Sequence, residues 1–425
     1  MSDIRPFRAL RYDPARVDLA KVIAPPYDVI AAAERHVLYD RDPHNAVRLE
    51  LVRDVREESA TDYAEVPRTL AAWQREGVLV RDPRPAFYAL RQRFQGPDGA
   101  ARERIACFGL LRCEDYGKRS VRPHERTLAG PKQDRLKLLR AARANLSSVL
   151  LLYEDRDDAI AGLLVEALAS RPLGEARDPA GHLHTLARID ADAPVAALRR
   201  QLADRALVIA DGHHRYETSL AYRDEQRAAH PGAGPDAPFE FLLACFTNAY
   251  APGSLLLPIH RLVRCGPAPD DATWAARLPG WSQREVPIAG PEAVPGLLEQ
   301  HLAPLRDAHA FAADDASGRL RIFWRPRGAG GELGIRVLHR EVIEGVFGLD
   351  EEAVRQGAIE YPKDAVQTAR DVRAGGGAVA LYLNPLQPED VFRVTEAGEV
   401  LPQKSTFFYP KLPTGLVFRT LAEEP

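Results

Sequence analysis

Residues 207–218 read LVIADGHHRYET, and this stretch decides how the surrounding chain folds. Its first residues are apolar and rich in β-branched side chains, which is typical of a buried strand. Asp211-Gly212 then predicts a tight turn, because glycine adopts backbone conformations that other residues avoid. A helix is expected from His213 or His214 onward. This arrangement places free N–H groups and the positive end of a helix dipole in front of the turn.

The side chains around this turn favour an anionic ligand. Arg215 can bind two phosphate oxygens at once, and histidine can donate a hydrogen bond or transfer a proton near neutral pH. We therefore predict a phosphate site made of Asp211, Gly212 and Arg215. His213 and His214 are the candidate catalytic residues.

Metal binding is the competing interpretation of the same residues. Adjacent side chains such as His213 and His214 point in different directions on a helix and make a poor chelating pair. One of them could still bind a metal with Asp211 and with His124 or His260. We expect no protein-bound structural metal, whereas Mg²⁺ bound through carboxylates and helping a phosphate fits better.

A second polar cluster, RPHERT at 122–127, continues into GPKQDR at 130–135 between a predicted strand and a predicted helix. One interpretation is a solvated loop. If the cluster instead faces residues 211–215, it supplies Glu125 as a candidate general base. It would also supply three anion-binding residues: Arg126, Lys132 and Arg135.

A third cluster near the C-terminus, Lys404-Ser405-Thr406 followed by Lys411, also carries groups suited to phosphate. Lys404 is the candidate phosphate contact from this cluster. The aromatic residues 407–409 indicate either core or a stacking platform. Walker A, GxGxxG, GxSxG and kinase signatures are missing from the sequence, so the common nucleotide-binding folds have no support.

The remaining pattern predicts an α+β protein with three parts: residues 1–80, a core at 81–264 that contains DGHHR, and residues 265–425, whose tail returns toward the site. Helices are expected at 63–76 and 132–144, a hairpin at 86–94 and 104–111, and strands at 46–51, 149–153, 202–210, 239–246, 255–263, 379–383 and 391–394.

Bulk composition bounds the class of protein. The chain has 425 residues, of which 45% are apolar and 28% charged, so it folds with more than one core. A net charge of −3 gives no general attraction to nucleic acid or anionic membranes. Four scattered cysteines and the lack of a signal peptide or a membrane-length apolar run predict a cytoplasmic protein. The predicted phosphate site makes a small-molecule phosphate or serine substrate the expected partner.

Five blocks in order make the chain similar to a known family. They are PPYDVI (25–30), RTLAGPKQDRLKLLRAARANLSSVLLLYE (126–154), IADGHHRYETSLAYR (209–223), LPIHRLV (257–263) and QKSTFFYPKLPTGLVF (403–418). With these blocks the chain resembles the proteins catalogued as domain of unknown function 1015. Its DGHHR element is also similar to the ParB/sulfiredoxin-like superfamily, which includes ADP-dependent free serine kinases.

This resemblance implies a ParB/sulfiredoxin-like core with N-terminal and C-terminal elaborations. It also implies that residues 211–215 bind nucleotide or substrate phosphate, and that Glu125, matched by its position ahead of that motif, acts as the base. The implied enzyme transfers a phosphoryl group to or from free serine, as a serine kinase or a phosphoserine phosphatase. ADP or ATP would be a substrate and Mg²⁺ a cofactor.

Two alternatives belong to other classes. A non-catalytic nucleotide-binding switch or clamp would need a basic DNA-contacting surface and a helix-turn-helix, and neither is evident. A metal-dependent hydrolase of another phosphate ester would need carboxylates gathered near Asp211.

Overall fold

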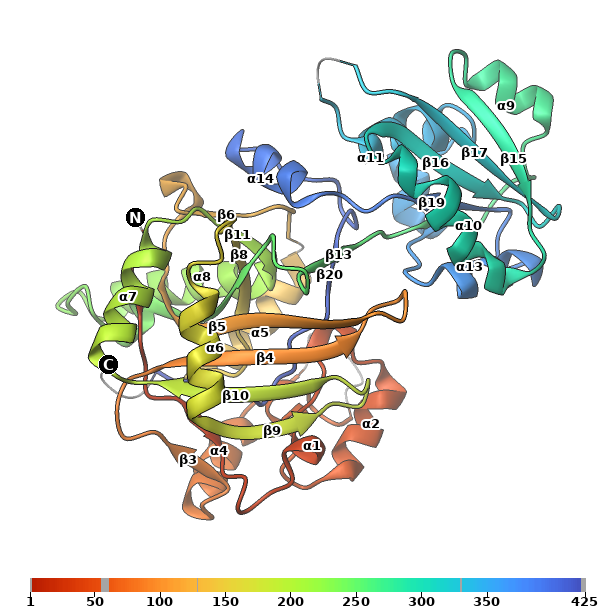
Figure 1. The fold of residues 1–425 in the computed structure, drawn as a ribbon. Helices are drawn as coiled ribbons and strands as arrows, with labels where there is room; N and C mark the ends of the chain where they lie inside the picture. Colours follow the sequence, from red (N-terminus) through yellow and green to blue (C-terminus); the bar gives the residue numbers. More distant parts are fainter. Residues whose placement is uncertain (1, 55–60, 128, 329–330, 422–425) are drawn as a thin grey trace. The chain divides into compact units, whose positions relative to one another are not determined.

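The computed structural model describes residues 2–54, 61–127, 129–328 and 331–421, and its mixed helices and sheets confirm the α+β class (Figure 1). The chain forms two compact units. Unit 1 is Met1–Leu255 with Thr395–Val400 and Pro410–Pro425, and unit 2 is Leu256–Val394 with Leu401–Tyr409. Unit 1 thus takes in the predicted segment 1–80 and nearly all of the predicted core. No helix in the described ranges has the length and apolar character needed to cross a membrane.

Unit 1 is built on a mixed sheet, to which the described residues contribute nine strands. They are β1 (Ile4–Arg5), β4 (Phe87–Gln95), β5 (Ala101–Arg112), β6 (Val121–Arg122), β8 (Val149–Tyr153), β9 (Pro172–Arg177), β10 (Leu183–Ile189), β11 (Leu207–Asp211) and β12 (Phe241–Asn248). The order is β6-β11-β8-β12-β5-β4-β10-β9, and β1 pairs with β5. The pairs β6–β11 and β8–β12 are parallel, and the other pairs are antiparallel.

Helices surround this sheet and form two hydrophobic cores. The helices of unit 1 are α1 (Leu19–Val22), α2 (Ala32–Arg41), α3 (Val47–Glu50), α4 (Glu65–Arg75), α5 (Ala129–Ala142), α6 (Ala161–Ser170), α7 (Asp192–Ala203) and α8 (His213–Ala229). One core joins the sheet to α6, α7 and α8, through residues such as Leu164, Leu198 and Tyr216. The other core is formed by the five helices from α1 through α5 and includes Phe418.

The tail segment, residues 410–421, is held in unit 1 by backbone pairing. Thr414 pairs with Ala24 and Phe418 with Leu10, while β21 (Arg419–Thr420) pairs with β7 (Ala144–Asn145). Leu10 also lies in β2 (Leu10–Tyr12), which pairs with β3 (Leu79–Arg81). The tail is therefore part of the unit that carries DGHHR.

The pairing of β6 with β11 positions the site. The two strands are parallel, with Leu207 opposite Val121 and Val208 opposite Arg122. Because the carboxyl ends of parallel strands meet at one edge of a sheet, the residues after Arg122 and after Asp211 leave the sheet side by side.

Unit 2 has an antiparallel sheet, with the order β15-β17-β16-β19-β14-β18 among its described strands. Its strands are β14 (Arg261–Val263), β15 (Ser282–Pro287), β16 (Ala308–Asp314), β17 (Arg319–Pro326), β18 (Ile359–Glu360) and β19 (Val379–Leu383). The helices are α9 (Asp271–Arg277), α10 (Val294–His301), α11 (Gly334–Val337), α12 (Glu351–Ala353), α13 (Ala365–Arg373) and α14 (Pro388–Glu396), and a separate pair joins β13 (Leu255–Leu257) to β20 (Phe407–Tyr409).

Three predicted strands are wrong in instructive ways. Residues 46–51 contain helix α3, and residues 391–394 lie in α14, because the apolar spacing in such short runs fits a helix as well as a strand. The single strand predicted at 255–263 is split into β13 and β14. Pro258 lies between them and cannot donate to a strand ladder. The predicted hairpin and the helices at 63–76 and 132–144 are confirmed, with shifted ends.

Candidate functional site

The DGHHR turn is fixed by its glycine. β11 ends at Asp211, Gly212 has φ 89° and ψ 30°, and α8 begins at His213. A Cβ atom at Gly212 would lie 2.9 Å from Nε of Arg215, so a larger residue would meet both backbone strain and a clash. Tyr216 donates its backbone N–H to the Gly212 oxygen at 3.0 Å, which closes the first helical turn.

Asp211 holds two cations at this turn. Its Oδ1 atom accepts from Nζ of Lys411 at 2.6 Å, and its Oδ2 atom accepts from Nη2 of Arg215 at 2.9 Å. Arg215 also donates through Nη1 to the carbonyl oxygen of Ser148. Burial acts to raise the pKa of Asp211, but the positive charges of Lys411 and Arg215 outweigh it and hold the pKa well below its usual range. Asp211 therefore anchors cations around the turn.

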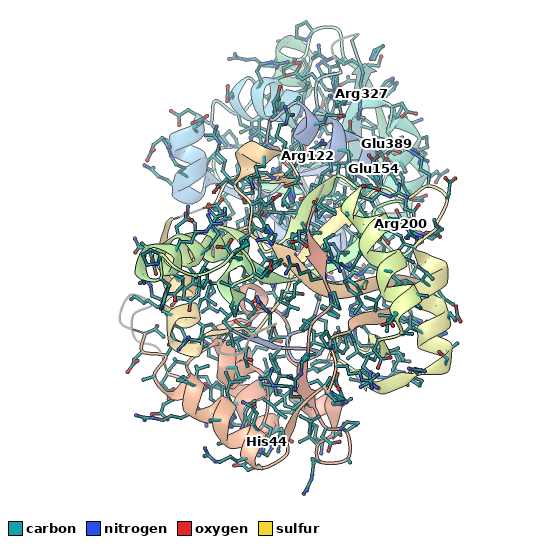
Figure 2. The ribbon with its side chains drawn as sticks, turned by 90° about the vertical axis from the view of Figure 1, so that its left-hand side faces the viewer. His44, Arg122, Glu154, Arg200, Arg327 and Glu389 are labelled. Atoms are coloured by element: carbon teal, nitrogen blue, oxygen red, sulfur yellow. The ribbon has the colours of Figure 1, made fainter. Side chains whose placement is uncertain are left out.

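Glu125 meets His213 at the start of α8. Arg122, labelled in Figure 2, ends β6 and leads into the loop that carries Glu125. The Oε1 atom of Glu125 is 3.2 Å from Nδ1 of His213, while Nε2 of His213 accepts the backbone N–H of His124 at 3.3 Å. The ring proton of His213 is thus on Nδ1 and is donated to Glu125. The Glu125 side chain keeps 36% of its surface exposed, so His213 orients it without closing it off.

The protonation states follow from this packing. Burial acts to raise the pKa of Glu125, but its hydrogen bond with His213 and the charges of His213 and His124 lower it to about 2. Burial lowers the pKa of His124 to about 3, and His124 donates from Nδ1 to the carbonyl oxygen of Ile209. Burial also lowers the pKa of His214, which is half-buried. At neutral pH the site thus holds an ionised Glu125 beside the neutral rings of His124 and His214.

Lys132 and Arg126 lie on the segment that follows Glu125. The Nζ atom of Lys132 donates to Oε2 of Glu217 at 2.9 Å, and Thr127 donates its hydroxyl to the same oxygen at 2.6 Å. This ties the start of α5 to α8 beside the site. The Arg126 side chain is exposed.

The other two predicted anion contacts have different surroundings. Arg135 is buried and donates to Oε2 of Glu50 at 2.9 Å and to the Tyr63 hydroxyl at 2.8 Å, which ties α5 to α3. Lys404 belongs to unit 2, where its carbonyl oxygen accepts from Nη2 of Arg261 at 3.1 Å. Phosphate binding by these two residues stays a prediction.

A sequence model of the family described as "Protein of unknown function (DUF1015)" matches residues 4–280. The chain belongs to the DUF1015 family. No curated protein matches this DUF1015 member.

Three solved structures are similar to it at low identity. A free serine kinase mutant in complex with ADP is 14% identical, covers 72% of this chain and 91% of its own, and has a TM-score of 0.35. A conserved hypothetical protein from Pyrococcus furiosus is 13% identical over 72% of this chain and 94% of its own, with a TM-score of 0.34. SbnI from Staphylococcus aureus, with a C-terminal truncation, is 11% identical, and the match covers 75% of this chain and 90% of SbnI, with a TM-score of 0.35. TM-scores this low do not establish a common fold.

The PPYD segment of this DUF1015 chain also contributes to the site, although its residues were not among the predicted site residues. Burial raises the pKa of Tyr27 to about 12, against the opposing charges of Arg215 and Arg135. The guanidinium of Arg135 lies 4.1 Å from the centre of the Tyr27 ring. Asp28 also contributes to the electrostatic field at His214. The rigid Pro-Pro pair before Tyr27 was the available signal.

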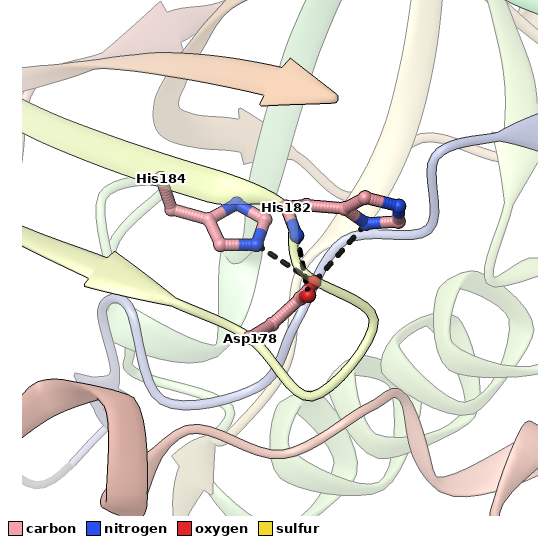
Figure 3. A group of neighbouring side chains, drawn as sticks. All are labelled: Asp178, His182 and His184. Atoms are coloured by element: carbon pink, nitrogen blue, oxygen red, sulfur yellow. Dashed lines mark hydrogen bonds and ion pairs between the residues drawn. The ribbon is translucent and has the colours of Figure 1, made fainter. Parts of the chain in front are cut away.

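A second carboxylate–histidine cluster of this DUF1015 protein joins Asp178 and His182, in the turn between β9 and β10, to His184 on β10 (Figure 3). The Oδ2 atom of Asp178 is 3.2 Å from Nδ1 of His182 and 2.9 Å from Nε2 of His184, and its Oδ1 atom accepts the backbone N–H of His182 at 2.9 Å. One ligand atom from each residue lies within 4.8 Å of the others. Two histidines and a carboxylate form a donor set suited to zinc.

Hydrogen bonding at this second cluster favours a proton over a metal ion. Arg104 donates to Oε1 of Gln92, which turns the amide nitrogen of Gln92 toward Nδ1 of His184 at 3.2 Å. Nδ1 is then the acceptor, and the ring proton of His184 sits on Nε2, facing Asp178. A metal bound there would have to displace this proton.

Proposed function

We propose that this protein transfers a phosphoryl group to or from the hydroxyl of free serine, on a ParB/sulfiredoxin-like core. The observation that carries the proposal is the contact between Glu125 and His213 at the start of α8. It places an ionised, half-exposed carboxylate beside a helix start whose turn also gathers Lys411 and Arg215. The choice of serine follows the resemblance of the DGHHR element to free serine kinases.

The geometry supports a division of labour at this site. The N–H groups at the start of α8 and the dipole of that helix would hold the transferring phosphoryl group, with Lys411 and Arg215 adding positive charge. His213 fixes the direction of the Glu125 carboxylate, which would accept a hydrogen bond from the attacking hydroxyl or water. A carboxylate with a pKa of about 2 is a weak base. That strength is sufficient because phosphoryl transfer through a loose transition state depends mainly on positioning and charge neutralisation.

A nucleotide and Mg²⁺ belong to the proposal as substrate and cofactor. Mg²⁺ normally binds through one or two carboxylates, waters and substrate phosphates. Asp211 does not fit as its ligand, since both Asp211 oxygens contact cations. Glu125 is the half-exposed carboxylate at the site. The phosphates of ADP or ATP and water would therefore supply most of the ligands of Mg²⁺. The cations around Asp211 also give no support to a metal-dependent hydrolase centred there.

The test is a set of phosphoryl-transfer assays with Mg²⁺: phosphoserine alone, serine with ADP and serine with ATP. Glu125→Gln keeps the size of the side chain and removes its charge, and Glu166→Gln, an exposed position on α6, is the matched control. Turnover that Glu125→Gln loses and Glu166→Gln keeps would support the proposal, and the productive substrate set gives the direction. Nucleotide binding without turnover on any set would refute it in favour of a switch.

A further inference from the structure

Arg104, on β5, is a buried cation that lacks a counterion. Its side chain is 1% exposed, and burial lowers its pKa to about 10. Within the described parts of the chain no carboxylate pairs with it, and its one hydrogen-bond acceptor is Oε1 of Gln92, reached from Nε at 2.9 Å and from Nη2. A guanidinium has five N–H donors, and a buried charge is costly unless it is paired. Arg104 is therefore equipped for an anion that the chain itself does not provide.

Two other buried arginines show the contrast. Arg419, in unit 1, donates to the carbonyl oxygens of Phe241 and Pro238 and to the side chain of Asn145. Arg261, in unit 2, donates to three carbonyl oxygens, those of Ile259, His260 and Lys404. Burial lowers the pKa of each to about 10, as for Arg104. Carbonyl oxygens surround these two guanidinium groups, whereas Arg104 has one amide oxygen.

Arg104 is connected to the DGHHR turn through Gln92 and Lys411. The amide nitrogen of Gln92 donates to the carbonyl oxygen of Lys411 at 3.4 Å, and Nζ of Lys411 donates to Oδ1 of Asp211 at 2.6 Å. The charge of Asp211 also acts on Arg104 directly. Around this one carboxylate lie three cations: Arg104, Arg215 and Lys411. Positive charge thus extends from the start of α8 toward β5.

We propose that Arg104, oriented by Gln92, binds the carboxylate of the amino-acid substrate whose side-chain oxygen reacts at the start of α8. This inference rests on the proposed function and adds the group that selects an amino acid over a simple alcohol. The planar fork of a guanidinium matches a carboxylate, which can accept from two of its N–H groups at once. Gln92 holds the fork in place without neutralising it.

Burial sets a condition for binding. Because Arg104 is 1% exposed, a substrate reaches it only when a neighbouring segment moves. The bond from Gln92 to the carbonyl of Lys411, at 3.4 Å, is the longest in the network from Arg104 to Asp211. The contact between the tail and Gln92 is therefore the weakest of this network.

The experiment compares serine with ethanolamine, which is serine without its carboxylate, or phosphoserine with phosphoethanolamine if the enzyme runs in that direction. Wild type is expected to prefer the serine compound. Arg104→Met should lower kcat/KM for the serine compound on the order of 100-fold, chiefly through KM, and lower the ethanolamine value much less. Arg419→Met removes a buried arginine with carbonyl partners and is the matched control, expected to leave the ratio of the two substrates unchanged.

Thermal unfolding separates this role from a structural one. Arg104→Met removes an unpaired buried charge but also the donors to Oε1 of Gln92, so its midpoint should change little, whereas Arg419→Met should lower it. A wild type that treats both substrates alike would overturn the inference, as would an Arg104→Met variant that loses both activities equally.

Failure of the proposed function itself gives a different result. If wild type turns over none of these compounds, calorimetric titration with L-serine and L-phosphoserine still tests the carboxylate contact. Binding to wild type that Arg104→Met loses would support the inference independently of catalysis. No binding to wild type, or equal binding to both proteins, would overturn it.

Discussion

Two clusters in unit 1 join one carboxylate to histidine rings, and their surroundings set them apart. At the start of α8, Glu125 accepts from His213, and the Glu125 side chain is 36% exposed. In the turn between β9 and β10, Asp178 accepts from His182 and His184, and the Asp178 side chain is 13% exposed. The same kinds of side chain thus form a solvent-accessible site in one place and a buried hydrogen-bonded cluster in the other.

The difference teaches that the environment of a carboxylate–histidine pair, rather than its composition, indicates its role. Glu125 lies beside a helix start, with two cations held at the adjacent turn by Asp211. Both oxygens of Asp178 are occupied, Oδ1 by a backbone N–H and Oδ2 by two rings. The first arrangement can act on a ligand, and the second stabilises a turn.

The largest expected effect separates the two clusters by activity. Glu125→Gln should lower the rate of phosphoryl transfer by about 100-fold to 10,000-fold, because the carboxylate that orients the reacting hydroxyl is lost. Asp178→Asn should keep most of the activity, since no reacting group contacts Asp178. Steady-state kinetics of both variants, with circular dichroism as a check of folding, make the comparison. Equal losses would mean that both clusters belong to one site.

Stability should depend on the Asp178 cluster more than on the Glu125 cluster, the reverse of the expected effects on activity. Asp178→Ala removes the acceptor of three hydrogen bonds from buried groups of His182 and His184, so the free energy of unfolding should fall by about 2–3 kcal/mol. Glu125→Ala removes a half-exposed contact and should cost less than about 1 kcal/mol. Urea unfolding of the two variants measures the difference. A cost for Glu125→Ala as large as that for Asp178→Ala would contradict the assignment of the open cluster to catalysis.

The local part of the site could be predicted from the sequence. An apolar strand, Asp-Gly and a helical sequence follow one another in β11 and α8, so the turn at Gly212 needs no distant information. The approach of Glu125 to His213 depends on the parallel pairing of β6 with β11, which local patterns do not encode. The resemblance implied only that Glu125 acts as the base.

Local patterns did not place distant segments at the site, although Lys411 was part of the third polar cluster. Lys411 reaches Asp211 because the tail pairs with the N-terminal segment, as Thr414 does with Ala24. Arg104 looked like one of many arginines in a strand, and only the packed sheet shows that it lacks a carboxylate partner. The strand predicted at 391–394 was wrong for a related reason. Four residues are too few to distinguish the spacing of a helix from that of a strand.

A smaller effect is expected from the cations that distinguish the open cluster. Lys411→Met should weaken binding of the phosphorylated substrate about tenfold, because one charge-assisted contact is lost while Arg215 still pairs with Asp211. Lys132→Met is the matched comparison, since its ammonium is held by Glu217 beside the site. Calorimetric titration with phosphoserine gives both affinities. An unchanged affinity in Lys411→Met would remove the tail lysine from the site.

The most gradual effect, spread over several pH units, is the pH dependence of stability, and it too differs between the clusters. Burial lowers the pKa of His124 from 6.5 to about 3, so as pH falls below about 6.5 the unfolded chain takes up this proton first. The contribution of His124 is therefore complete above pH 6.5 and is lost toward pH 3, by at most about 1.4 kcal/mol per pH unit. Burial also lowers the pKa of His184, but the charge of Asp178 opposes that shift, so His184 contributes less to the slope.

Free energies of unfolding measured between about pH 7 and pH 5 test whether stability falls on acidification. The wild type should lose stability as pH falls, and His124→Asn should flatten the slope more than His184→Asn does. Glu125 enters only at lower pH, since its pKa is lowered from 4.5 to about 2 and its stabilisation is lost within that window. A wild type that gains stability on acidification from pH 7 would contradict the lowered pKa of buried His124.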